Sequence, residues 1–165
     1  MSKLSNGVVL FAATLALPSA AQAMPMGGTF SGHVDSQMPQ VLGPDAMKVQ
    51  QTASGTNAGP GTPLDGAQVR WVETVTLKNG QGPVEGTITF TTPGGTTANA
   101  YKGMATTDAQ GRVTAKGTYS STDATGEFTG IRGKGTFTVA YSSKTDFTGA
   151  WKGDVKMPNQ RSSNR

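Results

Sequence analysis

The sequence predicts an all-β protein: a single antiparallel, mostly up-and-down barrel of about eight strands that follows a cleaved leader. Three observations indicate this fold class. No segment after the leader has the 3.6-residue period of an amphipathic helix. About eight segments alternate apolar or small residues with polar ones, which is the period of a half-buried strand. Short runs of Gly, Asp, Asn and Thr separate these segments, as expected of turns between neighbouring strands.

Residues 1–23 have the organisation of a secretory signal peptide. Lys3 supplies a positive start, Val8–Leu17 is an apolar core, and Ala21-Gln22-Ala23 fits the small-x-small cleavage rule. The apolar run is too short to cross a bilayer of roughly 30 Å as a helix. We therefore expect a bacterial protein that is exported to the periplasm or the medium, with a mature chain that starts at Met24.

Composition excludes several classes of function. The chain has no Cys, so it holds no disulfide, thiolate metal site, Cys nucleophile or lipidated Cys. Of its 14 Lys and Arg residues, Lys3 lies in the leader and Lys156, Arg161 and Arg165 lie in the last ten residues. The remainder balances the 10 acidic residues, so the barrel is neutral and lacks the basic face of a nucleic-acid binder. We expect residues 24–156 to form the barrel and 157–165 to be a disordered basic tail.

The first part of the mature chain contains two predicted strands and a long loop. In the strand over 28–35, Phe30, Gly32 and Val34 share one face. A weaker strand over 46–52 places Met47 and Val49 on one face. Residues 53–65 are rich in Gly, Pro, Ser, Thr and Asn, which predicts the longest loop of the protein.

The middle of the chain contains a predicted hairpin. The strand over 66–77 is the clearest, and its inward face carries five residues: Val69, Trp71, Glu73, Val75 and Leu77. Asn79-Gly80 predicts a tight turn, because both positions tolerate a positive φ. The return strand over 83–92 has an inward face of four residues: Val84, Gly86, Ile88 and Phe90.

The last third of the chain continues the alternation. Strands are predicted over 97–106, 112–120 and 146–155, with turns at 93–95, 108–111 and 123–126. The run ATGEFTGIRGKGTFTVAY, residues 124–141, combines glycines with aromatic residues, which is typical of a strongly curved sheet. Its later part is a strand, and its Phe128, Phe137 and Tyr141 are expected to fill the interior. The outward positions are mostly Thr, Lys, Ser, Asp and Glu, whereas a membrane barrel needs an outward apolar band, so we expect no membrane span.

Glu73 is the most informative single residue for function. The alternation of the strand over 66–77 places the Glu73 carboxylate on an apolar face, so this carboxylate must be paired, near water or protonated. One interpretation makes Glu73 a ligand anchor or a weak catalytic candidate inside the barrel. The other is that a bulge changes the register, or that Glu73 lies at a wet rim beside Arg or Lys.

Large aromatic side chains share the predicted inward faces. Either they fill the core or they line a ligand site together with Glu73. The candidate ligand-binding residues are Trp71, Glu73, Phe90, Tyr101, Tyr119, Phe137, Tyr141 and Trp151.

Other constellations carry no predicted chemistry. Ser31, His33 and Asp35 lie on one strand surface, whereas a catalytic triad converges from separate elements. No further His or Cys completes a zinc site around His33, so we expect no metal and no cofactor. The glycines of 130–135 have the wrong spacing for a phosphate loop.

The segment TGEFTGIRGKGTF, residues 125–137, resembles the "T/S-G-x-F-x-G-x-x-G-x-G-x-F" segment of barrels similar to allene oxide cyclase, a family that includes dirigent-like proteins. GAWKG, residues 149–153, is similar to their closing strand. The resemblance implies an eight-stranded calycin-like barrel with an apolar cavity, assembled into homo-oligomers. The cyclases close the ring of an unsaturated fatty-acid epoxide with a Glu on the first strand and a bound water. The first strand of this chain has only the outward-facing Asp35, so that role is not carried over to Glu73.

Three functional hypotheses follow. The first is an exported, non-catalytic barrel that binds a small, largely apolar molecule in its interior. The second is a cyclase or isomerase that uses a preorganised barrel and one acid. The third is a structural or envelope-associated protein with a solid barrel. A cavity larger than roughly 300 Å³ distinguishes the first two from the third.

Overall fold

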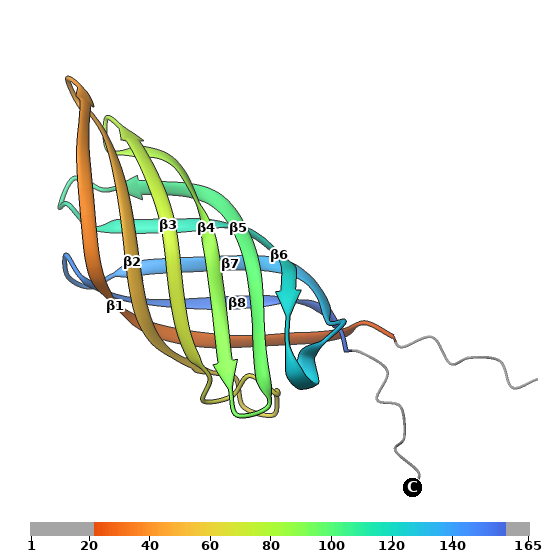
Figure 1. Cartoon of the computed structure of the whole chain (residues 1–165). Coiled ribbons are helices and arrows are strands. Elements are labelled where there is room, and N and C mark those ends of the chain that lie inside the picture. The colour runs from red at the N-terminus through yellow and green to blue at the C-terminus, as the bar shows by residue number, and fades with distance from the viewer. Residues whose placement is uncertain (1–21, 158–165) are drawn as a thin grey trace, which may run out of the picture.

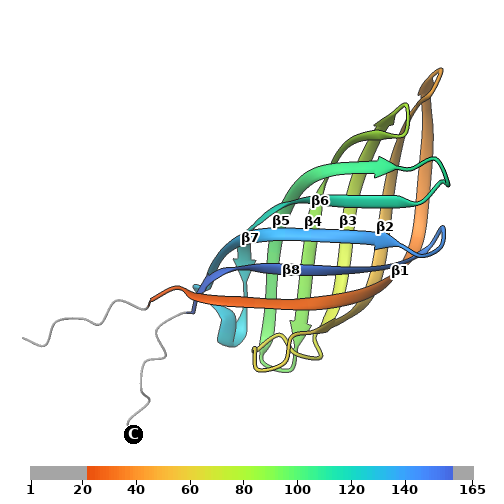
Figure 2. The same cartoon turned by 180° about the vertical axis from the view of Figure 1, so that it is seen from behind.

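The computed structural model describes residues 22–157 and shows a closed barrel of eight strands in sequence order (Figure 1). Each strand is antiparallel to the next, and β8 pairs with β1 to close the ring (Figure 2). The strands are β1 Met24–Gly43, β2 Ala46–Ala58, β3 Gln68–Lys78, β4 Gln81–Thr92, β5 Gly95–Thr107, β6 Val113–Ala124, β7 Arg132–Tyr141 and β8 Asp146–Lys156. The predicted all-β, up-and-down barrel is confirmed. Both the predicted signal peptide and the predicted basic tail lie largely outside the described residues.

β1 is longer than the predicted strand over 28–35 because it has two partners. Its first part, Met24 to His33, pairs with β8, and its part from Thr29 to Gly43 pairs with β2. A register shift between Val34 and Ser36 bends the strand after the doubly paired segment. The second half of β1 and the start of β2 form a hairpin that reaches beyond the other turns (Figure 1).

The loop predicted over 53–65 is wrong in its first part, because β2 continues to Ala58. Its inward positions are Ala53, Gly55 and Asn57, which pair with Val34, Gly32 and Phe30 of β1. A Cβ on Gly55 would lie 2.0 Å from the carbonyl oxygen of Ser31. Small residues therefore let β1 and β2 approach closely, and their loop-like composition masked the strand.

The two ends of the barrel differ. One end gathers the turns β1–β2, β3–β4, β5–β6 and β7–β8, and in the β3–β4 turn Asn79 and Gly80 have the predicted positive φ, 51° and 77°. The other end gathers the start of β1, the end of β8, the β2–β3 loop, the β4–β5 turn and the β6–β7 loop (Figure 1). Leu64, Phe128 and Ile131 from the loops at this second end are buried, so they cover it.

The run 124–141 supplies part of this cover. β6 ends at Ala124, and a short 3₁₀ helix, η1 Gly126–Phe128, follows where a simple turn was predicted. Phe128 is 3% exposed, and β7 begins at Arg132. The glycine-and-aromatic run therefore closes one end of the barrel and then returns to its wall.

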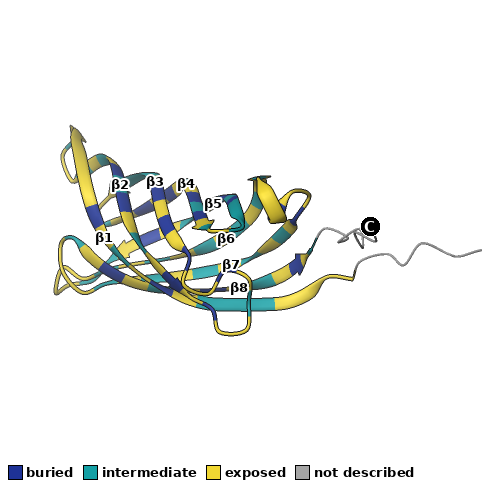
Figure 3. Cartoon of the chain, turned by 60° about the horizontal axis from the view of Figure 1, so that its bottom comes forward, coloured by how far each residue is buried: buried dark blue, intermediate teal, exposed yellow. Residues whose placement is uncertain are grey.

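Buried and exposed residues alternate along the strands (Figure 3). The aromatic side chains are buried or line the interior. Phe30, Trp71 and Phe147 form one packed group, with ring centroids 5.4 Å apart for Phe30–Trp71 and 5.1 Å for Trp71–Phe147. Tyr101 and Phe137 form a second contact at 5.3 Å. These rings line the interior without filling it. Within residues 22–157 no helix is long and apolar enough to cross a membrane.

Candidate ligand-binding cavity

The barrel encloses a cavity of about 730 Å³. Its walls are mostly aliphatic and aromatic side chains from all eight strands. Leu64, Phe128 and Ile131 form its floor. The exposed Gln37 and Lys144 line its opposite end, so the cavity opens between the hairpin turns there.

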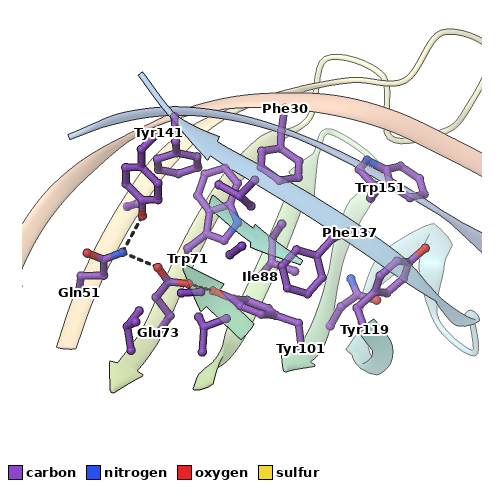
Figure 4. Close-up of a pocket in the computed structure, with 18 of the residues that line it drawn as sticks. Phe30, Gln51, Trp71, Glu73, Ile88, Tyr101, Tyr119, Phe137, Tyr141 and Trp151 are labelled. Atoms are coloured by element: carbon purple, nitrogen blue, oxygen red, sulfur yellow. Dashed lines mark hydrogen bonds between the residues drawn. The ribbon is translucent and has the colours of Figure 1, made fainter. Parts of the chain in front are cut away.

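Glu73 lies on the inner face of β3, where strand alternation predicted it. Its two carboxylate oxygens have different partners. One accepts a hydrogen bond from the side-chain amide of Gln51 on β2, and the other accepts one from the hydroxyl of Tyr101 on β5 (Figure 4). No bulge interrupts the pairing of Glu73 with Gln51 and Gly86. The regular strand pairing therefore places the Glu73 carboxylate inside the barrel, where two side chains donate hydrogen bonds to it. The interpretation that a bulge changes the register at Glu73 is wrong.

The network continues to two further strands. Gln51 Nε2 also donates to the hydroxyl of Tyr141 on β7 at 2.9 Å, and Gln51 Oε1 accepts from Gln37 Nε2 on β1 at 2.8 Å. Both protons of the Gln51 amide are thus used, whereas the proton of the Tyr141 hydroxyl is not used in this network. We call Glu73, Gln51, Tyr101 and Tyr141 the Glu73 cluster.

Gly86 makes the Glu73–Tyr101 contact sterically feasible. It lies between the two residues in the sheet and pairs with Glu73 on β3 and with Tyr101 on β5. A Cβ at this position would lie 2.7 Å from Glu73 Cβ and 2.8 Å from the Tyr101 hydroxyl. The missing side chain lets the tyrosine ring lie across β4 and reach the carboxylate.

The tyrosines of the cavity keep their protons well into the alkaline range. Burial, and then the charge of Glu73, raise the pKa of Tyr101 far above its usual value of 10. Burial raises the pKa of Tyr141 to about 12, with a smaller contribution from the Glu73 charge. At neutral pH the phenols are therefore protonated and can donate hydrogen bonds.

A second polar group lies near the floor of the cavity. Asn57 is 2% exposed; its Nδ2 donates to the carbonyl of Leu64 at 2.7 Å, and its Oδ1 accepts from Trp151 Nε1 at 2.8 Å. Trp151 therefore uses its one polar atom to hold the β2–β3 loop. The hydroxyls of Thr97 and Tyr119 are also buried and have no hydrogen-bond partner among residues 22–157.

All eight predicted site residues line this one cavity. Glu73, Tyr101 and Tyr141 meet in the cluster, Trp71 and Phe137 lie beside it, and Tyr119 and Trp151 lie toward the floor (Figure 4). Phe90 packs against Trp151, with ring centroids 6.1 Å apart. Whether they bind a ligand stays a prediction. Sequence reasoning missed Gln51, Thr97, Asn99 and Ser121, which are polar residues of the cavity wall, and the buried Asn57 below it. The Met47 and Val49 face of β2, continued at the same period, leads to Gln51 and Asn57.

His33 lies outside the cavity. It is exposed, and its Nδ1 lies 2.8 Å from Asp146 Oδ1 on β8, whereas Asp35 accepts from Ser54. The bond from His33 is the main reason why the pKa of Asp146 is lowered. Ser31, His33 and Asp35 thus form no catalytic group. In the described part of the chain, no three His, Asp or Glu side chains are placed to hold a metal ion.

No protein-family model matches this chain, and no curated protein matches it.

Proposed function

We propose that this protein binds one small, largely apolar molecule inside the barrel without changing it chemically, and that it does so after export. The observation that carries the proposal is the cavity of about 730 Å³. This volume lies within the roughly 300–1,000 Å³ that is usual for small-molecule sites. A few polar groups on an apolar wall are the usual composition of such sites, because apolar burial supplies affinity and the polar groups fix orientation.

The geometry supports a simple binding mechanism. The ligand enters between the hairpin turns, and its apolar body lies against Trp71, Phe137 and Ile88. The Glu73 cluster orients its polar end through the free Tyr141 proton or the remaining lone pairs of Glu73. The alternative of a structural protein with a solid barrel is disfavoured by the size of the cavity.

Native mass spectrometry of the protein purified from its own source tests the proposal. We expect a population heavier than the polypeptide by one small molecule. Ala115 lies on the cavity wall, so Ala115→Trp should obstruct the cavity and reduce this population. Ala140 is exposed on β7, so Ala140→Trp is the matched control and should retain it. A bare polypeptide mass for the wild type, or equal occupancy in both variants, would contradict the proposal.

The second candidate is an enzyme of the isomerase or cyclase type. The observation that favours it is the hydrogen bond between Glu73, a proton acceptor, and Tyr101, a proton donor, inside an apolar cavity. In such a reaction Glu73 would take a proton from a carbon next to a carbonyl while a tyrosine hydroxyl holds the enolate oxygen.

Deuterium exchange at the α carbons of 2-decanone in D₂O separates the two candidates. An enzyme of this type would accelerate the exchange, and Glu73→Gln would abolish the acceleration. Exchange at the rate found in buffer, with 2-decanone bound, would support binding alone.

A further inference from the structure

We infer that the ligand of this cavity is an amphiphilic cation: an apolar body that carries a single ammonium-type group placed against Glu73. The inference rests on the proposed binding function and specifies the chemical class of the ligand. Two features of the cavity wall lead to it, namely the charge balance around Glu73 and the aromatic rings that surround it.

The charge of Glu73 has no counter-charge in the cavity. Its partners, Gln51 and Tyr101, are both neutral. Among residues 22–157 the two ion pairs are His33–Asp146 and Arg112–Asp108, and neither involves Glu73. Arg112 and Lys144 lie at the mouth, where Arg112 Nε is 2.7 Å from Asp108 Oδ2 and Lys144 is exposed. Among the described residues Glu73 is thus the one acidic side chain of the cavity wall, and neither cation at the mouth forms an ion pair with it.

Both hydrogen bonds that Glu73 accepts come from neutral donors. Each oxygen of Glu73 already accepts one hydrogen bond, from Gln51 or from Tyr101. An alcohol would add one more neutral donor, whereas a cation would supply the charge that the cluster lacks. A carboxylate or phosphate ligand would place a second negative charge beside Glu73, which is unfavourable at low dielectric.

Aromatic rings surround the same point. Tyr101 and Tyr141 belong to the cluster, and Trp71 lies two residues from Glu73 on the same face of β3. Phe147 packs against both Trp71 and Tyr141, at centroid distances of 5.1 and 5.2 Å. The faces of such rings attract ammonium groups, most strongly in a desolvated site. A carboxylate and an aromatic wall together thus favour an organic cation over a metal ion.

Three ligands with the same ten-carbon chain test the inference: decylammonium, decanol and decanoate, titrated into the full mature chain by isothermal calorimetry at pH 7. We expect decylammonium to bind at least about tenfold more tightly than decanol and decanoate to bind most weakly. Equal affinity for all three, or tightest binding of decanoate, would overturn the cation and leave the apolar cavity intact. Failure of all three to bind would overturn the proposed function itself.

Two charge-removing variants locate the effect. Glu73→Gln should weaken decylammonium by about 10- to 100-fold and change decanol by less than about twofold. Glu85 is exposed on the outer face of the adjoining strand β4, so Glu85→Gln removes the same charge and should leave all three affinities unchanged. Circular dichroism establishes that both variants are folded. If the Glu73→Gln variant is unfolded, the relative affinities of the three ligands for the wild-type protein test the cation preference on their own. An unchanged cation preference in folded Glu73→Gln would contradict the inference.

Discussion

Glu73 keeps its carboxylate inside an apolar barrel because β2 and β5 supply hydrogen-bond donors to it. Burial of an unpaired carboxylate is costly, and each donor offsets part of that cost. Gly86 leaves room for Tyr101, and Gln51 links the carboxylate to Tyr141. The cluster is therefore a preorganised polar group in a wall that is mostly apolar.

Tyr101→Phe should lower the free energy of unfolding by about 1–3 kcal/mol, because it removes one donor from a partly buried carboxylate and keeps the ring. Tyr119→Phe is the matched control: the Tyr119 hydroxyl has no partner within residues 22–157, so its loss should cost less. Urea unfolding measures both. Equal stability losses would show that the Tyr101–Glu73 bond contributes nothing.

Part of the cluster was predictable from the sequence. Period two in the strand over 66–77 placed Glu73 inside, and the same rule placed Tyr101 and Tyr141 there. The partnership of Glu73 with Gln51 was not predictable, because it depends on the β2–β3 register, which pairs these two residues. The register is a property of the folded sheet and has no local sequence pattern here.

At the scale of elements, the β2–β3 loop helps to close one end of the barrel, together with the β6–β7 segment. Asn57 at the end of β2 binds Leu64 of this loop and Trp151 of β8, and the buried Leu64 covers the floor of the cavity. The predicted strands were confirmed wherever apolar residues alternated with polar ones. The end of β2 was missed, because its inward residues are as small as those of a turn.

Asn57→Ala should destabilise the barrel, because it leaves Trp151 Nε1 and the Leu64 carbonyl without their buried partner. Each such group costs about 1–3 kcal/mol. Gln50→Ala, at an exposed position of the same strand, should change stability by less than about 0.5 kcal/mol. Thermal unfolding of the two variants checks this expectation. Similar melting temperatures would mean that Asn57 does not hold the loop.

At the scale of the whole molecule, a closed sheet removes the edges that an open sheet would expose, and the chain achieves this closure without any Cys. The alternation of residues predicts the closure only indirectly, because it shows which residues share a face of the sheet and does not show how strongly the sheet curves. A cavity was likewise one of two outcomes, because the same inward aromatic residues suit a filled core or a lined pocket. In the structure these aromatic side chains pack in pairs along the wall and leave a cavity between them.

Alkaline pH should destabilise the fold. The pKa values of Tyr119 and Tyr141 are raised to about 12 in the folded protein, above the usual value of 10 that applies when the chain is unfolded. The folded state therefore holds these protons more tightly than the unfolded chain does. The contribution of the two phenols to the free energy of unfolding is fully present below about pH 10 and is lost as the pH rises through about 12. Urea unfolding across this range measures the decline, and Tyr141→Phe should make it shallower. Stability that is constant or rises over this range would contradict the buried positions of these phenols.

Titration with N-phenyl-1-naphthylamine, a neutral apolar fluorophore, tests the central claim that the barrel is hollow and takes up an apolar molecule. We predict saturable fluorescence enhancement with one site per chain. Ala115→Trp should weaken the binding at least about tenfold, whereas Ala140→Trp should not change it. No enhancement with the wild type, or equal affinity in the folded Ala115→Trp variant, would show that the interior of the barrel is not the binding site.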